Sequence, residues 1–149
     1  MKTGKTKVKS NPLEKDTKVE ELHRASQQWK SMLRFIEDEM IFIDRLLHSY
    51  VFEPDTPNLF ERLQNYLNRM KKSKSKKSRI ERNILNHEGD LWGMLECKDG
   101  IADKEYCQSH DKLGFEVMDF VNDFQILKSE IFNYAGGILK KRKPQSRIS

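Results

Sequence analysis

Apolar residues recur at alternating steps of three and four along three long stretches of this chain, and no other feature of the sequence is as regular. This spacing places them on one face of an α-helix and is typical of helices that pack side by side in bundles and coiled coils. In a half-buried β-strand, apolar residues would instead occur at every second position. We call each such series of positions a seam.

The three stretches cover residues 17–51, 57–97 and 103–140. The first seam, interrupted only by Ser26, comprises Val19, Leu22, Trp29, Leu33, Ile36, Met40, Ile43, Leu47 and Tyr50. The second comprises Leu59, Leu63, Tyr66, Met70, Ile80, Ile84, Leu91 and Met94, with polar residues at Ser73, Lys77 and His87. The third begins at His110 and continues through Leu113, Val117, Phe120, Phe124, Leu127, Ile131, Tyr134 and Ile138.

Local signals at the ends of the stretches support this division. Thr17 and Glu20 have the spacing of a capping box at the start of the first helix. Further start and stop signals are Asp55, Thr56 and Pro57 before the second helix, Asp99 and Gly100 after it, Asp103 before the third, and Gly136, Gly137 and Pro144 near its end. Both connections are short, so neighbouring helices should run antiparallel.

The sequence therefore predicts an all-α, elongated, antiparallel three-helix bundle over residues 17–140, with flexible basic tails at 1–16 and 141–149. The 149 residues fit one domain, and a hydrophobic fraction of 36% suits a narrow bundle with little core per residue. The longest apolar run, residues 40–43, is too short to span a bilayer, and the amino terminus lacks the apolar core of a signal peptide. We expect a cytoplasmic protein without membrane insertion.

The net charge of +5 conceals a sharp segregation along the chain. Residues 1–18 carry +4, residues 69–82 carry +7, residues 140–149 carry +5, and the rest of the chain carries −11. The central basic segment comprises Arg69, Lys71, Lys72, Lys74, Lys76, Lys77, Arg79 and Arg82. Clustered cations of this kind are one signature of a surface that binds nucleic acid or another polyanion.

Two other interpretations of the basic segment compete with a ligand surface. In the predicted hairpins, residue 72 lies level with the acidic residues 37–39. Arg69 and Lys76 flank the second seam, and the third seam is flanked by Glu116, Asp123 and Glu130. Internal charge matching between helices is the interpretation we favour. Alternatively, the serines and Lys77 interrupt the helix near residues 71–78, which would give four helices. The absence of Gly and Pro in this segment favours one continuous helix, and the absence of aromatic residues weighs against nucleic-acid binding.

Histidine and cysteine side chains converge at the end of the bundle that holds Gly100. Helix geometry puts His23, His87 and His110 within about two turns of the same height, with Cys107 nearby. Imidazole and thiolate are ligands of zinc and iron, so these four residues form a candidate metal site. No recognised spacing motif supports it, and half-buried seam histidines are the alternative. Cys97 and Cys107 are expected to stay reduced.

Several apolar residues lie off the seams, notably Phe35, Phe42, Trp92, Met118 and Phe132. They either widen the core or form an exposed patch that invites association. No phosphate loop, nucleophile elbow or paired-carboxylate motif is present, so we expect no enzymatic activity and no cofactor. The sequence favours a helical interaction or scaffold module that forms a homo-oligomer or binds a partner helix. Metal binding and weak nucleic-acid binding are the alternatives.

Overall fold

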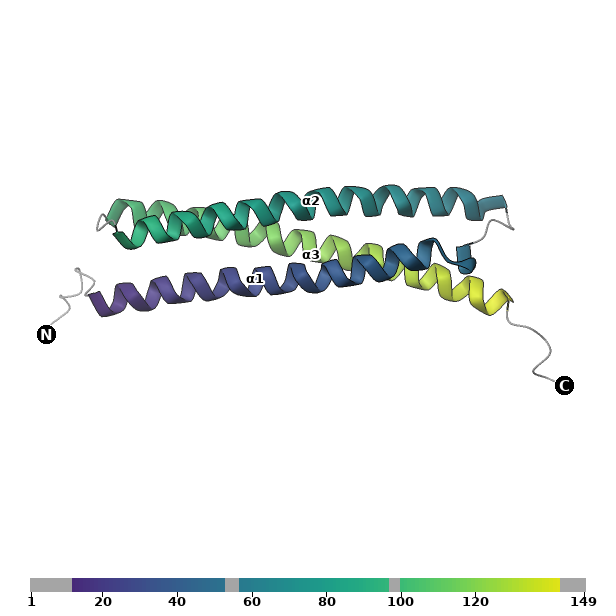
Figure 1. Ribbon diagram of the computed structural model, residues 1–149, viewed down its shortest axis with the longest axis horizontal. Coiled ribbons are helices and arrows are strands. Elements are labelled where there is room, and N and C mark those ends of the chain that lie inside the picture. The colour runs from purple at the N-terminus through teal and green to yellow at the C-terminus, as the bar shows by residue number, and fades with distance from the viewer. Residues whose placement is uncertain (1–11, 53–56, 97–99, 143–149) are drawn as a thin grey trace, which may run out of the picture.

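The computed structural model describes residues 12–52, 57–96 and 100–142, and most of these form three long helices (Figure 1). Helix α1 spans Pro12–Leu47, α2 spans Pro57–Glu96 and α3 spans Gly100–Arg142. A short 3₁₀ turn, η2, covers Tyr50–Phe52 after α1. The described residues contain no strand, and the predicted all-α three-helix fold is confirmed.

The helices lie alongside one another and the chain reverses direction at each connection, which gives an elongated bundle (Figure 1). Helices α1 and α3 therefore run in the same direction, and α2 runs antiparallel to both. Each helix borders the other two, so the bundle has three edges, which we call the α1–α2, α2–α3 and α1–α3 edges.

Helix α2 is continuous through the basic segment, so the alternative with a break near residues 71–78 is wrong. The seam runs through this segment without a change of phase, and no Gly or Pro interrupts it. Lys77 lies on the seam and is buried, but its side chain reaches carboxylates at the edge of the bundle. A long aliphatic chain with a terminal charge suits that position.

Most of the predicted seam residues form the core, which also includes Val51, Phe52, Tyr106 and Ala135. Leu33, Ile43, Ile84, Phe124 and Ile131 are among those with no exposed surface. One large hydrophobic cluster extends along most of the bundle, and a smaller one is formed by Val19, Leu22, Leu91 and Tyr106 near the connection between α2 and α3. Val51 and Phe52 of η2 belong to the large cluster, where they close the opposite end of the core. Tyr50, predicted on the first seam, is instead 66% exposed, because α1 ends at Leu47 and the η2 turn changes the direction of the residues that follow.

The start of α2 at Pro57 agrees with the prediction, whereas the ends of α1 and α3 differ from those predicted. Helix α1 begins at Pro12, so Thr17 lies inside it, and proline is well tolerated in a first turn because its missing N–H would have no intrahelical acceptor. Helix α3 begins at Gly100, which leaves Asp103 inside it, and continues through Gly136 and Gly137 to Arg142. Tertiary packing of a long seam outweighs the local cost of two glycines.

The core assignment predicts a large difference between two phenylalanines of α3. Phe124→Ala should lower the free energy of unfolding by about 3–5 kcal/mol, because Phe124 is fully buried and its removal leaves a cavity. Phe115→Ala is the matched control: Phe115 is 72% exposed, so its change should stay within about 0.5 kcal/mol. Urea unfolding followed by circular dichroism measures both, and equal losses would contradict the placement of the core.

Candidate interaction surface and buried histidine cluster

Ion pairs close the two edges of the bundle that involve α2. On the α1–α2 edge the pairs are Lys30–Glu88 at 3.0 Å, Lys77–Glu37 at 2.6 Å, and Lys74–Asp44. On the α2–α3 edge the pairs are Arg69–Glu130 at 2.8 Å and Lys76–Asp123 at 4.0 Å. The cations of the basic segment thus meet acids on both neighbouring helices, which supports internal charge matching.

These contacts shift the ionisation of the groups involved. The hydrogen bonds that Lys77 and Arg69 donate lower the pKa of Glu37 and Glu130 respectively. Burial acts to lower the pKa of Lys77, but its bonds to Glu37 and Glu81 outweigh burial and leave that pKa above its ordinary value. These charges are therefore held in place by one another.

Four members of the basic segment take part in the pairs described, and others point outward. Lys71, Lys72 and Arg79 are exposed on α2, and no ion pair joins them to any other residue that the structure describes. Together with Asn68 and Ser75 they border a shallow surface hollow on α2. Binding of a polyanion by these three exposed cations stays a prediction.

The α1–α3 edge has a different character. Its central ion pair joins Lys128 to Glu39, and both side chains are largely covered. Phe35 and Phe42 lie one helical turn on either side of Glu39, and Phe132 lies one turn after Lys128. All three phenylalanines are exposed, and Phe42 packs edge-to-face on Phe132 with 6.1 Å between ring centroids.

Further exposed apolar residues extend this feature along α3. Met118 lies fourteen residues before Phe132 and Leu139 lies seven after it, so all three lie in line on one side of the helix. We call the set Phe35, Phe42, Met118, Phe132 and Leu139 the apolar stripe. Sequence reasoning missed Leu139, although its seven-residue spacing from Phe132 was the available signal.

The corresponding outward positions on the other two edges are mainly polar. On the α1–α2 edge they hold Glu20, Gln27, Arg34, Ile41 and His48 from α1 and Gln64, Lys71, Ser78 and Leu85 from α2. On the α2–α3 edge they hold Asn65, Lys72, Arg79 and Asn86 from α2 and Lys112, Asp119, Ile126, Asn133 and Lys140 from α3. The apolar stripe is therefore a property of one edge and not a general feature of the surface.

The five predicted interaction residues have different outcomes. Phe35, Phe42, Met118 and Phe132 are exposed and share the α1–α3 edge, so they do not widen the core. Trp92 lies in α2, and its side chain is outside the part of the chain that the structure describes.

The histidine end of the bundle contains a buried aromatic cluster. The Nε2 atom of His87 lies 2.9 Å from Nδ1 of His110, so one ring donates a hydrogen bond to the other. Trp29 packs against His110 with 4.6 Å between ring centroids, and Tyr106 stacks on His87 at 4.1 Å. Gly114 gives Trp29 room, because a Cβ there would lie 3.1 Å from the indole ring.

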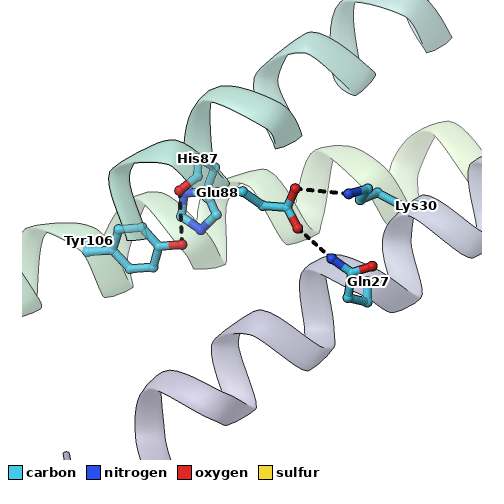
Figure 2. Close-up of polar contacts among 5 residues, drawn as sticks. All are labelled: Gln27, Lys30, His87, Glu88 and Tyr106. Carbon is cyan, nitrogen blue, oxygen red and sulfur yellow. Dashed lines mark hydrogen bonds and ion pairs between the residues drawn. The ribbon is translucent and has the colours of Figure 1, made fainter. Parts of the chain in front are cut away.

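Polar contacts surround this cluster (Figure 2). The Tyr106 hydroxyl donates to the backbone carbonyl of His87 at 3.1 Å. The adjacent residue, Glu88, is buried and points toward α1, where Gln27 donates to one carboxylate oxygen at 2.7 Å and Lys30 to the other at 3.0 Å. Figure 2 shows that consecutive residues of α2 thereby contact both other helices. The cluster fixes the three helices relative to one another.

Burial lowers the pKa of both histidines. For His87 the nearby carboxylates of Asp90 and Glu88 oppose this effect without cancelling it. For His110 the neighbouring His87 lowers the pKa further, while Asp111 opposes the shift. A hydrogen bond between two imidazoles needs one N–H and one lone pair, and two protonated rings would place two N–H groups against each other. The doubly protonated pair is therefore disfavoured, and because burial lowers both pKa values the neutral pair is the favoured form at neutral pH.

The candidate metal ligands do not come together as a metal site. Within residues 12–52, 57–96 and 100–142, no group of three or more His, Cys, Asp and Glu side chains could hold a metal ion. His87 and His110 meet, but they bond to each other. Cys107 is a half-buried thiol at the margin of the smaller hydrophobic cluster, and His23 is half-buried on α1. Cys97 lies outside the described residues.

Comparison of the chain with models of known protein families, with curated proteins and with solved structures finds no match. Among the described residues, no helix combines the length and the apolar character that crossing a lipid bilayer requires.

The histidine pair predicts a fall in stability in mild acid. Both pKa values lie below the ordinary 6.5, so the unfolded chain binds more protons than the folded protein as pH falls below that value. The free energy of unfolding should therefore decrease as the pH is lowered from about 7.5 to about 5.5. Urea unfolding at each pH measures this change.

A double variant tests whether the pair is the source. His87→Leu/His110→Leu removes both polar partners together, which is less disruptive than removing one, and it should flatten the pH dependence. His48→Gln is the control, because His48 is exposed and its loss should leave the dependence intact. An unchanged dependence in the double variant would assign the effect to other groups.

Proposed function

We propose that this protein is a non-enzymatic helical interaction module that self-associates through the apolar stripe. The observation that carries the proposal is the contrast among the three edges of the bundle. All three edges carry ion pairs, but the outward positions of two edges are mainly polar, with Ile41, Leu85 and Ile126 as the exceptions, whereas the third edge exposes Phe35, Phe42 and Phe132 together. Aligned aromatic residues on an otherwise charged surface are typical of protein–protein interfaces.

The local arrangement of the stripe favours association of folded chains. Phe42 and Phe132 come from two different helices and already contact each other, so their shared surface is fixed by the bundle. A partner that docks there buries aromatic area without first having to order the residues that it contacts. Aromatic side chains in such positions commonly supply most of the binding energy of an interface.

The stripe predicts the effect of a single charge on oligomer mass. Wild-type protein should show a mass that is a multiple of the 17.7 kDa chain, and Phe42→Asp should shift it toward the single-chain mass. The reason is that a carboxylate at the centre of an apolar interface would lose its water on association. Light scattering coupled to size-exclusion chromatography, over a range of protein concentrations, measures the mass.

Leu85→Asp is the matched control for this experiment. Leu85 is 59% exposed on α2, close to the 58% of Phe42, but it lies away from the stripe. It should leave the oligomer mass unchanged. Circular dichroism should show full helicity for both variants, and dissociation by Leu85→Asp alone would place the interface elsewhere.

A further inference from the structure

The borders of the apolar stripe carry an uneven distribution of charge. On α3 the adjoining outward residues are uncharged: Phe115, Asn122, Ser129 and Gly136. On α1 the adjoining residues include Asp38, four residues before Phe42, and Arg45, three residues after it. Both are exposed, and neither has an ion pair with another residue in the described part of the chain.

If two copies of the chain associate through the apolar stripe, each copy presents the same bordering residues to the other. In a twofold dimer the interface is self-complementary. If a first residue of one copy contacts a second residue of the other copy, the second residue of the one copy also contacts the first residue of the other. Two face-to-face arrangements satisfy this condition. An axis parallel to the helices lays α1 on α3 of the second copy, where Asp38 and Arg45 meet uncharged residues. An axis perpendicular to the helices lays α1 antiparallel on α1 of the second copy.

Only the antiparallel arrangement pairs the two charges. Asp38 and Arg45 are separated by about 10 Å along α1, and the midpoint between them lies at the level of Phe42. With the axis at that level, Asp38 of each copy faces Arg45 of the other. Phe132 contacts Phe42 and therefore lies at the same level, so the aromatic pair falls on the axis of the dimer.

We infer that the α1–α3 edge binds a second copy of this chain in antiparallel orientation, with Phe42 and Phe132 at the twofold axis and reciprocal Asp38–Arg45 ion pairs on either side. This inference rests on the proposed self-association and adds its orientation. The apolar stripe supplies the buried surface, and the two reciprocal pairs discriminate between orientations, as flanking charges do in other helical assemblies.

Charge reversal tests the orientation. Asp38→Arg and Arg45→Asp each turn two attractive contacts into two repulsive ones, so each alone should raise the dimer dissociation constant by at least about 10-fold. The double variant Asp38→Arg/Arg45→Asp restores both pairs with reversed sign and should dimerise like the wild type. An equimolar mixture of the two single variants should form a heterodimer, because each then supplies what the other lacks.

Sedimentation equilibrium of the full chain at low and high salt measures these constants, and circular dichroism verifies that each variant is folded. Arg34→Asp is the control, since Arg34 lies on the α1–α2 side of the same helix and should have no effect. Screening by salt should weaken the effect of the single reversals.

Failure of the orientation can be distinguished from failure of the proposed function. If Phe42→Asp gives monomers but the single reversals dimerise normally, or if the double variant and the mixture fail to recover, the antiparallel arrangement is wrong and self-association stands. If the wild type is monomeric at all concentrations, or if Phe42→Asp leaves its mass unchanged, the proposed interface is wrong and the inferred arrangement falls with it.

Discussion

The shared burial of three seams is the constraint on which the rest of this structure depends. Each helix must turn its seam toward the common core, and this fixes the direction of every other position around the helix. Positions beside the seam then face one of the two neighbouring helices, and the remaining positions face solvent. Ion pairs, the buried histidines and the exposed aromatic residues are all located by that single condition.

The segregation of charge along the sequence becomes complementarity in the bundle. Helix α2 carries the basic segment in its middle and lies between two helices that are acidic at the same level. Arg69 reaches Glu130 on α3, while Lys77 reaches Glu37 on α1. Exposed pairs such as Arg69–Glu130 add little stability individually, but together the ion pairs favour one register and one order of helices. The cations of α2 thus lie on two edges, whereas the third edge exposes the apolar stripe on either side of the Lys128–Glu39 ion pair.

Much of the fold could be predicted from the sequence because a seam extends over many residues. The charged flanks could also be assigned, since the seven-residue register alone places Arg69 and Lys76 opposite acids on the third helix. The ends of α1 and α3 were less accurate than the start of α2, because caps are local preferences of small energy that tertiary packing overrides. The height of His87 and His110 was predicted, but the bond between them depends on side-chain rotamers that spacing alone does not determine.

The apolar stripe could be predicted only in part, for a geometric reason. Periodicity shows that Phe35 and Phe132 lie off their seams, but whether they share an edge depends on which side of α1 is occupied by α3. That is a property of the handedness of the bundle, and the sequence pattern is the same for either hand. The Lys128–Glu39 contact identifies the side on which α3 lies.

In the proposed dimer, that contact would also limit how tightly two copies bind. Glu39 and Lys128 lie beneath the stripe, and the Oε1 atom of Glu39 is buried with no hydrogen-bond partner among the described residues. A second copy that covers the phenylalanines would remove the pair from its remaining solvent, and desolvation of an ion pair offsets much of its Coulombic attraction. The aromatic area therefore favours association while the charge beneath it opposes complete burial. This balance favours a dimer of folded chains that forms and dissociates as protein concentration changes. It disfavours an obligate dimer, in which each chain would fold only together with its partner.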